Sequence, residues 1–98
     1  IMKSIDIHVS TARHPLWISA STIQRGAWLS FVLYSAKNDT DGVIVGAWLW
    51  TDQQWLDATG GLISDLDDVD NIEANSPLWK WVGDDLHIEL YPRRRRTR

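Results

Sequence analysis

The sequence predicts an α+β domain over residues 1–92, with three helices and a small antiparallel sheet, followed by a basic segment over residues 93–98. Three observations support this class. Ser21 with Gln24 and Thr51 with Gln54 have the spacing of capping boxes, which begin helices. Short apolar runs bounded by Gly, Asn and Asp are typical of strands. Ninety-eight residues with 44% apolar composition are enough for one domain with a small core.

The first half of the chain predicts a strand and then a long central helix. Residues 4–10 alternate, with Ile5, Ile7 and Val9 on one face, which is typical of a half-buried strand. From Ser21 onward, apolar residues follow at helical spacing: Ile23, Ala27, Trp28, Phe31, Val32, Tyr34 and Ala36. A stripe this wide predicts a mostly buried helix. Residues 37–42 are loop formers that end it.

The second half predicts a strand, two helices and a hairpin. Residues 43–45 form a short apolar run, and the helix that begins at Thr51 buries Trp55 and ends at Gly60-Gly61. Ser64 begins a third helix, with an apolar stripe of Leu62, Leu66, Val69 and Ile72. Residues 78–82 and 86–91 flank Gly83-Asp84-Asp85 as a hairpin. From the first helix onward, this is the order of a winged helix-turn-helix, with the hairpin as the wing and residues 4–10 as an extra N-terminal strand.

The net charge of −3 conceals a strong asymmetry. Five of the ten basic residues lie in the last six positions: Arg93, Arg94, Arg95, Arg96 and Arg98. Residues 1–92 therefore keep 10 − 5 = 5 basic residues against 13 acidic ones, a net charge of −8. We expect the arginine-rich segment to be disordered unless bound, and to grip phosphate as a flexible arm together with Lys80 of the hairpin. The alternative is a solvated terminus or the beginning of a linker.

The third helix and the hairpin supply a second candidate surface, for a protein partner. The helix would present acidic and amide side chains to solvent, among them Asp67, Asp68, Asp70, Asn71 and Glu73. Between Gly26 and Leu78 the only Lys or Arg is Lys37, so insertion of this helix into a DNA groove is disfavoured. Trp79 and Trp81 alternate along one strand and could dock a partner or a base. The alternatives are a solvated helix face whose carboxylates favour the helix start, and tryptophans that belong to the core.

Several function classes lack their residues in this sequence. Without cysteine there is no disulfide framework and no thiolate metal site, and His8, His14 and His87 lack metal-ligand spacing. No nucleophile lies beside an activating base. We therefore expect a non-enzymatic protein without metal, cofactor or small-molecule substrate. Because no signal peptide and no apolar run of ~18 residues is present, we also expect a soluble, cytoplasmic protein with no membrane contact.

The chain resembles the small winged-helix domains at the N-terminus of phage replisome-organiser and replication-initiator-like proteins. The matching positions are His14-Pro15, Arg25-Gly26-Ala27-Trp28-Leu29, Thr40-Asp41-Gly42-Val43-Ile44, Trp50-Thr51-Asp52, Trp55, Leu78-Trp79, Asp84-Asp85-Leu86-His87-Ile88 and Tyr91-Pro92. They cover most of residues 14–92. The resemblance implies a winged-helix fold in which the third helix and the wing face DNA or a replication partner.

Two functional hypotheses follow. The first is a nucleic-acid-binding module of replication or transcription type, which grips DNA mainly through the arginine-rich segment. The second is a protein-interaction module, as a homodimer or with another protein, which uses the acidic third helix and exposed tryptophans.

Overall fold

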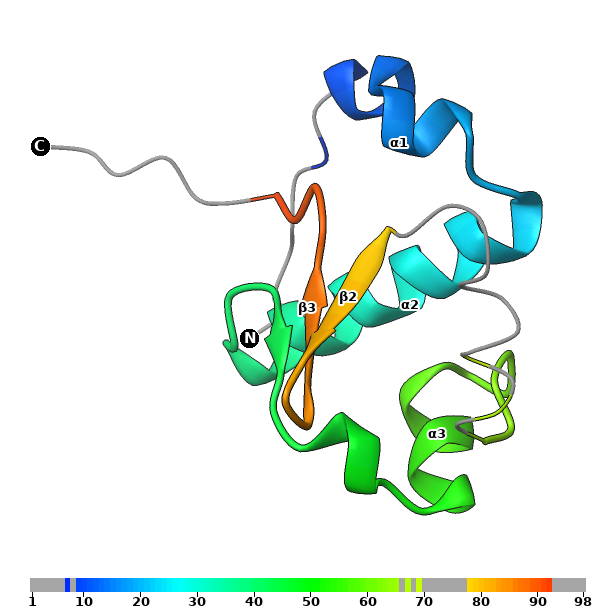
Figure 1. Ribbon diagram of the computed structural model, residues 1–98, viewed down its shortest axis with the longest axis vertical. Coiled ribbons are helices and arrows are strands. Elements are labelled where there is room, and N and C mark those ends of the chain that lie inside the picture. Colours follow the sequence, from blue (N-terminus) through cyan, green and yellow to red (C-terminus); the bar gives the residue numbers. More distant parts are fainter. Residues whose placement is uncertain (1–6, 8, 66, 68, 70–77, 93–98) are drawn as a thin grey trace, which may run out of the picture.

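The computed structural model describes residues 7, 9–65, 67, 69 and 78–92. Their elements are η1 (Val9–Arg13), α1 (Pro15–Ile18), α2 (Thr22–Asn38), β1 (Val43–Ile44), η2 (Ala47–Leu49), α3 (Asp52–Ala58), β2 (Trp79–Val82) and β3 (Asp85–Ile88), where η denotes a 3-10 helix. Three α-helices and a three-stranded antiparallel sheet confirm the predicted α+β class (Figure 1).

The predicted N-terminal strand is wrong where the chain is described. Val9 and Ser10 begin η1, and both Ile7 and Val9, expected on a buried face, are exposed. The described sheet has the order β1-β3-β2 and contains no segment from this end of the chain. A strand needs a neighbour to satisfy its backbone N–H and C=O groups, and alternation alone does not supply one. Residues 4–6 and 8 lie outside the described part of the chain.

Helix α2 begins where its capping box predicts. Ser21 Oγ accepts a hydrogen bond from the N–H of Gln24 (3.1 Å), and Gln24 Oε1 accepts one from the N–H of Ser21 (2.7 Å). Trp28 and Phe31 are buried as expected, but Ile23 is exposed. Exposed apolar residues also occur elsewhere on α2, at Leu29 and Leu33. Because α2 is apolar on most of its surface, its sequence period does not fix which apolar side chains face inward.

The sheet has β3 at its centre, with β1 and β2 antiparallel on either side. Trp79 pairs with Ile88 and Val82 with Asp85, so the turn is Gly83-Asp84 and the predicted hairpin is confirmed. Helix α2 crosses behind the sheet in Figure 1 and contacts β1 and β3. Strand β3 ends at Ile88, three residues earlier than predicted, and Leu90 has a left-handed backbone (φ 58°) that does not continue the strand.

Aromatic rings form much of the core between α2, α3 and the sheet. Phe31 packs edge-on against Trp79 (5.1 Å between ring centroids) and Trp55 (6.3 Å), and all three rings are fully buried. Trp28 Nε1–H donates to the carbonyl oxygen of Glu89 at 2.6 Å, which ties α2 to the chain just after β3. These contacts hold the hairpin onto the helices.

A polar corner joins the end of α2 to the start of β1. Ser35 Oγ is fully buried, accepts a hydrogen bond from the N–H of Gly42 (2.7 Å) and lies 2.7 Å from Thr40 Oγ1. Gly42 has φ +88°, and a Cβ there would lie 2.9 Å from Cγ of Tyr91. Its carbonyl oxygen accepts from the N–H of Ile88 at 2.8 Å. The loop after α2 is therefore fixed by a buried hydroxyl and by the chain that follows β3.

The second predicted capping box is also confirmed, at the start of α3. Thr51 Oγ1 accepts from the N–H of Gln54, and Gln54 Oε1 accepts from the N–H of Thr51. The helix ends before Gly60 and Gly61, which have φ values of +61° and +87°. Both glycines therefore adopt the left-handed conformations that end helices at little cost.

The predicted third helix is described only in part. Asp67 and Val69 are helical, and Val69 is buried as its place in the apolar stripe predicts. Leu62, expected in the same stripe, is exposed. Leu66 and Ile72 lie outside the described residues.

Candidate functional site

Of the residues predicted to bind phosphate, the structure describes only Lys80 of the hairpin. Arg93, Arg94, Arg95, Arg96 and Arg98 lie outside the described residues, so their role remains a prediction. Lys80 is exposed on β2, and its Nζ lies 3.7 Å from Oε1 of Glu89. An ion pair between exposed groups contributes roughly 0–1 kcal/mol. A phosphate that approached Lys80 would also meet the carboxylate of Glu89.

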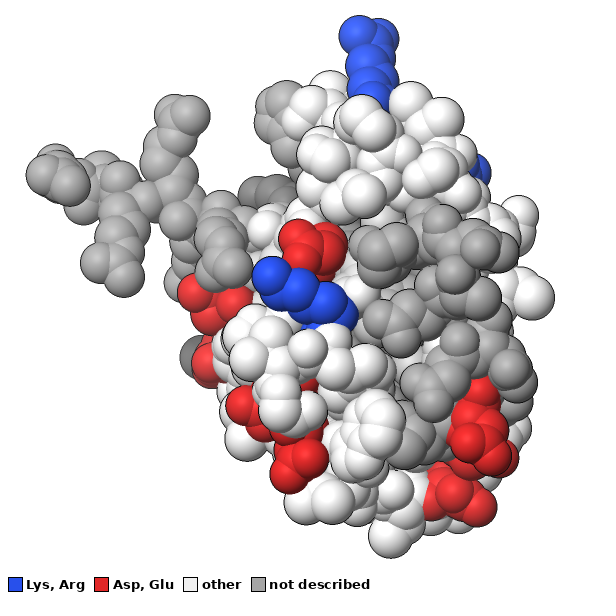
Figure 2. All heavy atoms as spheres, in the orientation of Figure 1, with Lys and Arg blue, Asp and Glu red and all other residues white. Residues whose placement is uncertain are grey.

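The other described cations are dispersed over the fold. Arg25 serves a structural purpose: its Nε and Nη2 donate to the carbonyl oxygen of Trp17 (3.1 and 3.0 Å), and its guanidinium lies 5.2 Å from the centroid of the Trp17 ring. Arg13 is on η1 and Lys37 is at the end of α2. In Figure 2 the blue side chains are separate from one another. The described surface thus offers no cluster of cations on which a run of phosphates could lie.

Of the acidic and amide residues predicted to form a partner surface on the third helix, the structure describes one. Asp67 is exposed and helical, whereas Asp68, Asp70, Asn71 and Glu73 lie outside the described residues. Residues 38–79 contain nine acidic side chains and no Lys or Arg. In the lower part of the face seen in Figure 2, the described side chains are red or white and none of them is blue. DNA phosphates would be repelled from this part of the molecule.

The prediction that Trp79 could dock a partner is wrong, because the ring is fully buried against Phe31. The competing interpretation, that these tryptophans cover the helices as core, is confirmed for Trp79. Trp81 is half-buried and packs edge-on against Trp55 (6.4 Å) and Trp48 (5.0 Å). Neither tryptophan of β2 is a freely exposed platform.

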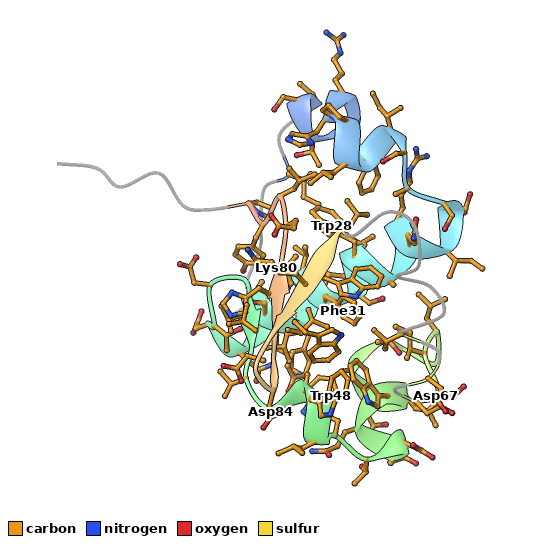
Figure 3. All side chains as sticks on the ribbon, viewed as in Figure 1. Trp28, Phe31, Trp48, Asp67, Lys80 and Asp84 are labelled. Atoms are coloured by element: carbon orange, nitrogen blue, oxygen red, sulfur yellow. The ribbon has the colours of Figure 1, made fainter. Side chains whose placement is uncertain are left out.

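Another tryptophan is exposed at a position that the sequence analysis did not single out. Trp48 on η2 is 41% exposed. Its backbone N–H donates to the backbone carbonyl oxygen of Asp84 in the hairpin turn (3.0 Å). Large apolar side chains around it are also exposed: Val45 (70%), Leu49 (72%) and Val82 (48%). We call these four residues, with Asp84, the tip surface. Figure 3 shows Trp48 and Asp84 at the end of the molecule where η2 meets the β2–β3 turn.

A 3-10 helix explains this exposure. It has three residues per turn, so consecutive side chains point in three different directions. In η2 the buried direction is taken by Ala47, and Trp48 and Leu49 face solvent. The signal in the sequence was Gly46 followed by consecutive large apolar residues. A helix as short as η2 cannot bury all of these side chains on one side.

A shallow groove lies between α2 and α3. Its volume is about 340 Å³, and it is lined by Leu33, Tyr34, Lys37, Trp50, Gln54, Asp57 and Ala58. The Tyr34 and Trp50 rings meet edge-to-face at 5.2 Å within it. The rim has one cation and one carboxylate and hence no net charge, which does not favour phosphate binding.

Among the described residues, no group of three or more His, Asp or Glu side chains could hold a metal ion. In the same part of the chain, none of the helices has the length and apolarity needed to cross a bilayer. Comparison with known proteins finds no matching family model, no matching curated protein and no matching solved structure.

Proposed function

We propose that this chain is a non-enzymatic winged-helix module that binds nucleic acid, with the arginine-rich segment supplying most of the affinity. The architecture supports the winged-helix part of the proposal. In a winged helix, the strand after the first helix of the motif pairs with the second strand of a C-terminal hairpin. Here β1 follows α2 and pairs with β3, whose other neighbour is β2.

The distribution of charge carries the nucleic-acid part. Protein cations that neutralise phosphates release the counterions of DNA, and this release supplies most sequence-independent affinity. The four cations of the described residues are separate: Arg25 is bound to main-chain carbonyls and Lys80 is paired with Glu89. Five arginines in six positions are the concentrated positive charge of the chain. Under this proposal the folded part positions that segment and does not insert its acidic third helix into a groove.

We propose a role in DNA replication because the sequence resembles replisome-organiser and replication-initiator-like domains. The residues that carry it, such as Gly42 and Trp79, have structural roles in this fold. They support the winged-helix architecture more than a particular DNA site.

The direct test is binding to a fluorescently labelled DNA duplex at low salt. We expect the full chain to bind, and a variant with all five arginines of residues 93–98 changed to Gln to lose at least ~100-fold in affinity at low salt. Lys80→Gln, which removes one cation from the folded part, is the control. We expect it to lose only a small part of the DNA affinity. Equal binding by the full chain and the five-arginine variant would refute the proposal.

The second candidate is a protein-interaction module, and the tip surface favours it. Exposed tryptophans are enriched among residues that dominate protein interfaces. In this candidate Trp48, and not the buried Trp79, is the tryptophan that docks the partner. This candidate predicts no duplex binding at physiological salt, together with association that depends on Trp48.

A further inference from the structure

We infer that the tip surface binds the arginine-rich segment of a second copy of this chain, so that copies associate head to tail. This inference goes beyond the proposed function and does not depend on it, because it concerns the protein without DNA. It rests on three features: a rigid exposed tryptophan, the exposed Asp84 beside it, and the end of the sheet from which the chain leaves toward the arginine-rich segment.

The tip surface is held in place before any partner arrives. The N–H of Trp48 is bonded to the carbonyl oxygen of Asp84 (3.0 Å), and the N–H of Gly46 is bonded to Oδ1 of Asp85 (2.9 Å). The Trp48 ring also stands perpendicular to that of Trp81, at 5.0 Å between centroids. Two segments far apart in sequence are thereby joined, and a partner would not need to order them.

Arginine is the side chain that suits this chemistry. A guanidinium stacks on an aromatic face while it donates hydrogen bonds to a carboxylate, and its three methylene groups cover apolar neighbours. The tip surface offers all three: the exposed ring of Trp48, the exposed Asp84, and the aliphatic Val45 and Leu49. The fold already contains one such pair, since Arg25 lies over Trp17 at 5.2 Å.

Charge complementarity favours the arginine-rich segment as the occupant. Residues 1–92 carry a net charge of −8, and the five arginines of residues 93–98 carry +5. No Lys or Arg interrupts residues 38–79, which include η2 and α3. One part of the chain is therefore complementary to another.

The topology favours binding between copies over binding within one. Strand β3 runs from Asp85, beside the turn, toward Pro92. The described chain consequently ends, at Pro92, on the side of the sheet away from the tip surface (Figure 1). To reach its own tip, the six-residue segment, about 20 Å long when extended, would have to reverse and run back beside the four residues of β3, about 13 Å, so that only its last residues would arrive. A second copy can present its segment without this reversal.

The contact would be heterologous, since two different surfaces meet. Such contacts build rings or open chains of molecules rather than only dimers. Because the contact is electrostatic and exposed, it should weaken as salt is added.

Sedimentation velocity of the full chain without DNA tests the inference. At low salt we expect the weight-average sedimentation coefficient to rise with protein concentration, and to fall to that of a monomer at high salt. The five-arginine-to-Gln variant, which alters no described residue, should remain monomeric. Trp48→Ala should raise the dissociation constant for self-association about tenfold. Asp84→Asn should also raise this constant. Ile18→Ala, which truncates an exposed apolar side chain on α1, is the matched control and should associate like the unmodified chain.

A synthetic peptide of residues 91–98, added in excess, should dissociate the assemblies. Should the unmodified chain be monomeric at low salt over the whole concentration series, the inference is wrong. It is equally wrong if the five-arginine variant self-associates as strongly as the unmodified chain, or if Trp48→Ala and Asp84→Asn both do. Duplex binding separates this result from the proposed function, because Trp48→Ala should bind DNA as the unmodified chain does.

Discussion

Ser35→Ala is the substitution that best tests how the corner between α2 and β1 is held. The Ser35 hydroxyl is fully buried, accepts the Gly42 N–H at 2.7 Å and lies 2.7 Å from Thr40 Oγ1. Removing it leaves the N–H of Gly42 buried without a partner. The corner sets the start of β1, the strand that completes the sheet beside β3.

The expected cost follows from the unpaired group. A buried donor without an acceptor costs about 1–3 kcal/mol, against a total stability of about 5–15 kcal/mol for a small domain. Alanine recovers a few tenths of a kcal/mol through its helix propensity. We therefore expect Ser35→Ala to lower the free energy of unfolding by about 1–2.5 kcal/mol. Urea unfolding followed by tryptophan fluorescence measures this loss. If the slope of the free energy of unfolding against urea concentration is unchanged, only the stability has changed.

Ser30→Ala is the matched control, because it makes the same chemical change on the same helix. Ser30 Oγ donates to the carbonyl oxygen of Gly26 (3.1 Å), one turn earlier in α2, and this oxygen already belongs to the hydrogen-bonded backbone of the helix. We expect this variant to lie within about 0.5 kcal/mol of the unmodified chain. Equal losses for the two serines, or no loss at Ser35, would refute the role given to the corner.

Two further predictions concern the same core and the tip surface. Gly42→Ala should destabilise the fold by at least ~2 kcal/mol, since a left-handed backbone costs an L-residue about 1–2 kcal/mol and the new Cβ would lie 2.9 Å from Cγ of Tyr91; a melting temperature equal to that of the unmodified chain would contradict this. Trp79→Ala should cost about 3–5 kcal/mol, and Trp48→Ala about 1–2 kcal/mol, because the Trp48 ring is partly exposed but packs against that of Trp81; urea unfolding with circular dichroism measures both. Similar costs at the two positions would show that Trp48 belongs to the core.

Local hydrogen-bond signals in the sequence predicted the fold well. Both capping boxes begin helices at the expected residues, and the predicted hairpin forms with the turn Gly83-Asp84, one residue shorter than expected. These signals are reliable because the interacting groups are three or four residues apart and need no other part of the chain. The strand predicted over residues 4–10 lacks this property, since it depends on a neighbour that the described sheet does not provide.

Predictions about which side chains are buried were less successful, because burial depends on packing between distant elements. Ile23 follows the helical period of α2 and is nevertheless exposed, while the alternation of Trp79 and Trp81 did not reveal that one is buried and the other half-buried. The candidate site shows the same limit. Trp48 reaches the surface because a short 3-10 helix turns Ala47 inward, a detail of backbone geometry that composition and periodicity do not encode.

The salt dependence of duplex binding tests the central claim most directly. If the five arginines of residues 93–98 each neutralise one phosphate, the logarithm of the binding constant should fall against the logarithm of salt concentration with a slope of about −4.5. Each Arg→Gln substitution in the segment should reduce the size of that slope by about 0.9, and Lys80→Gln should change it much less. A slope that stays the same when all five arginines are replaced would contradict the account and place the phosphate contacts on the folded domain.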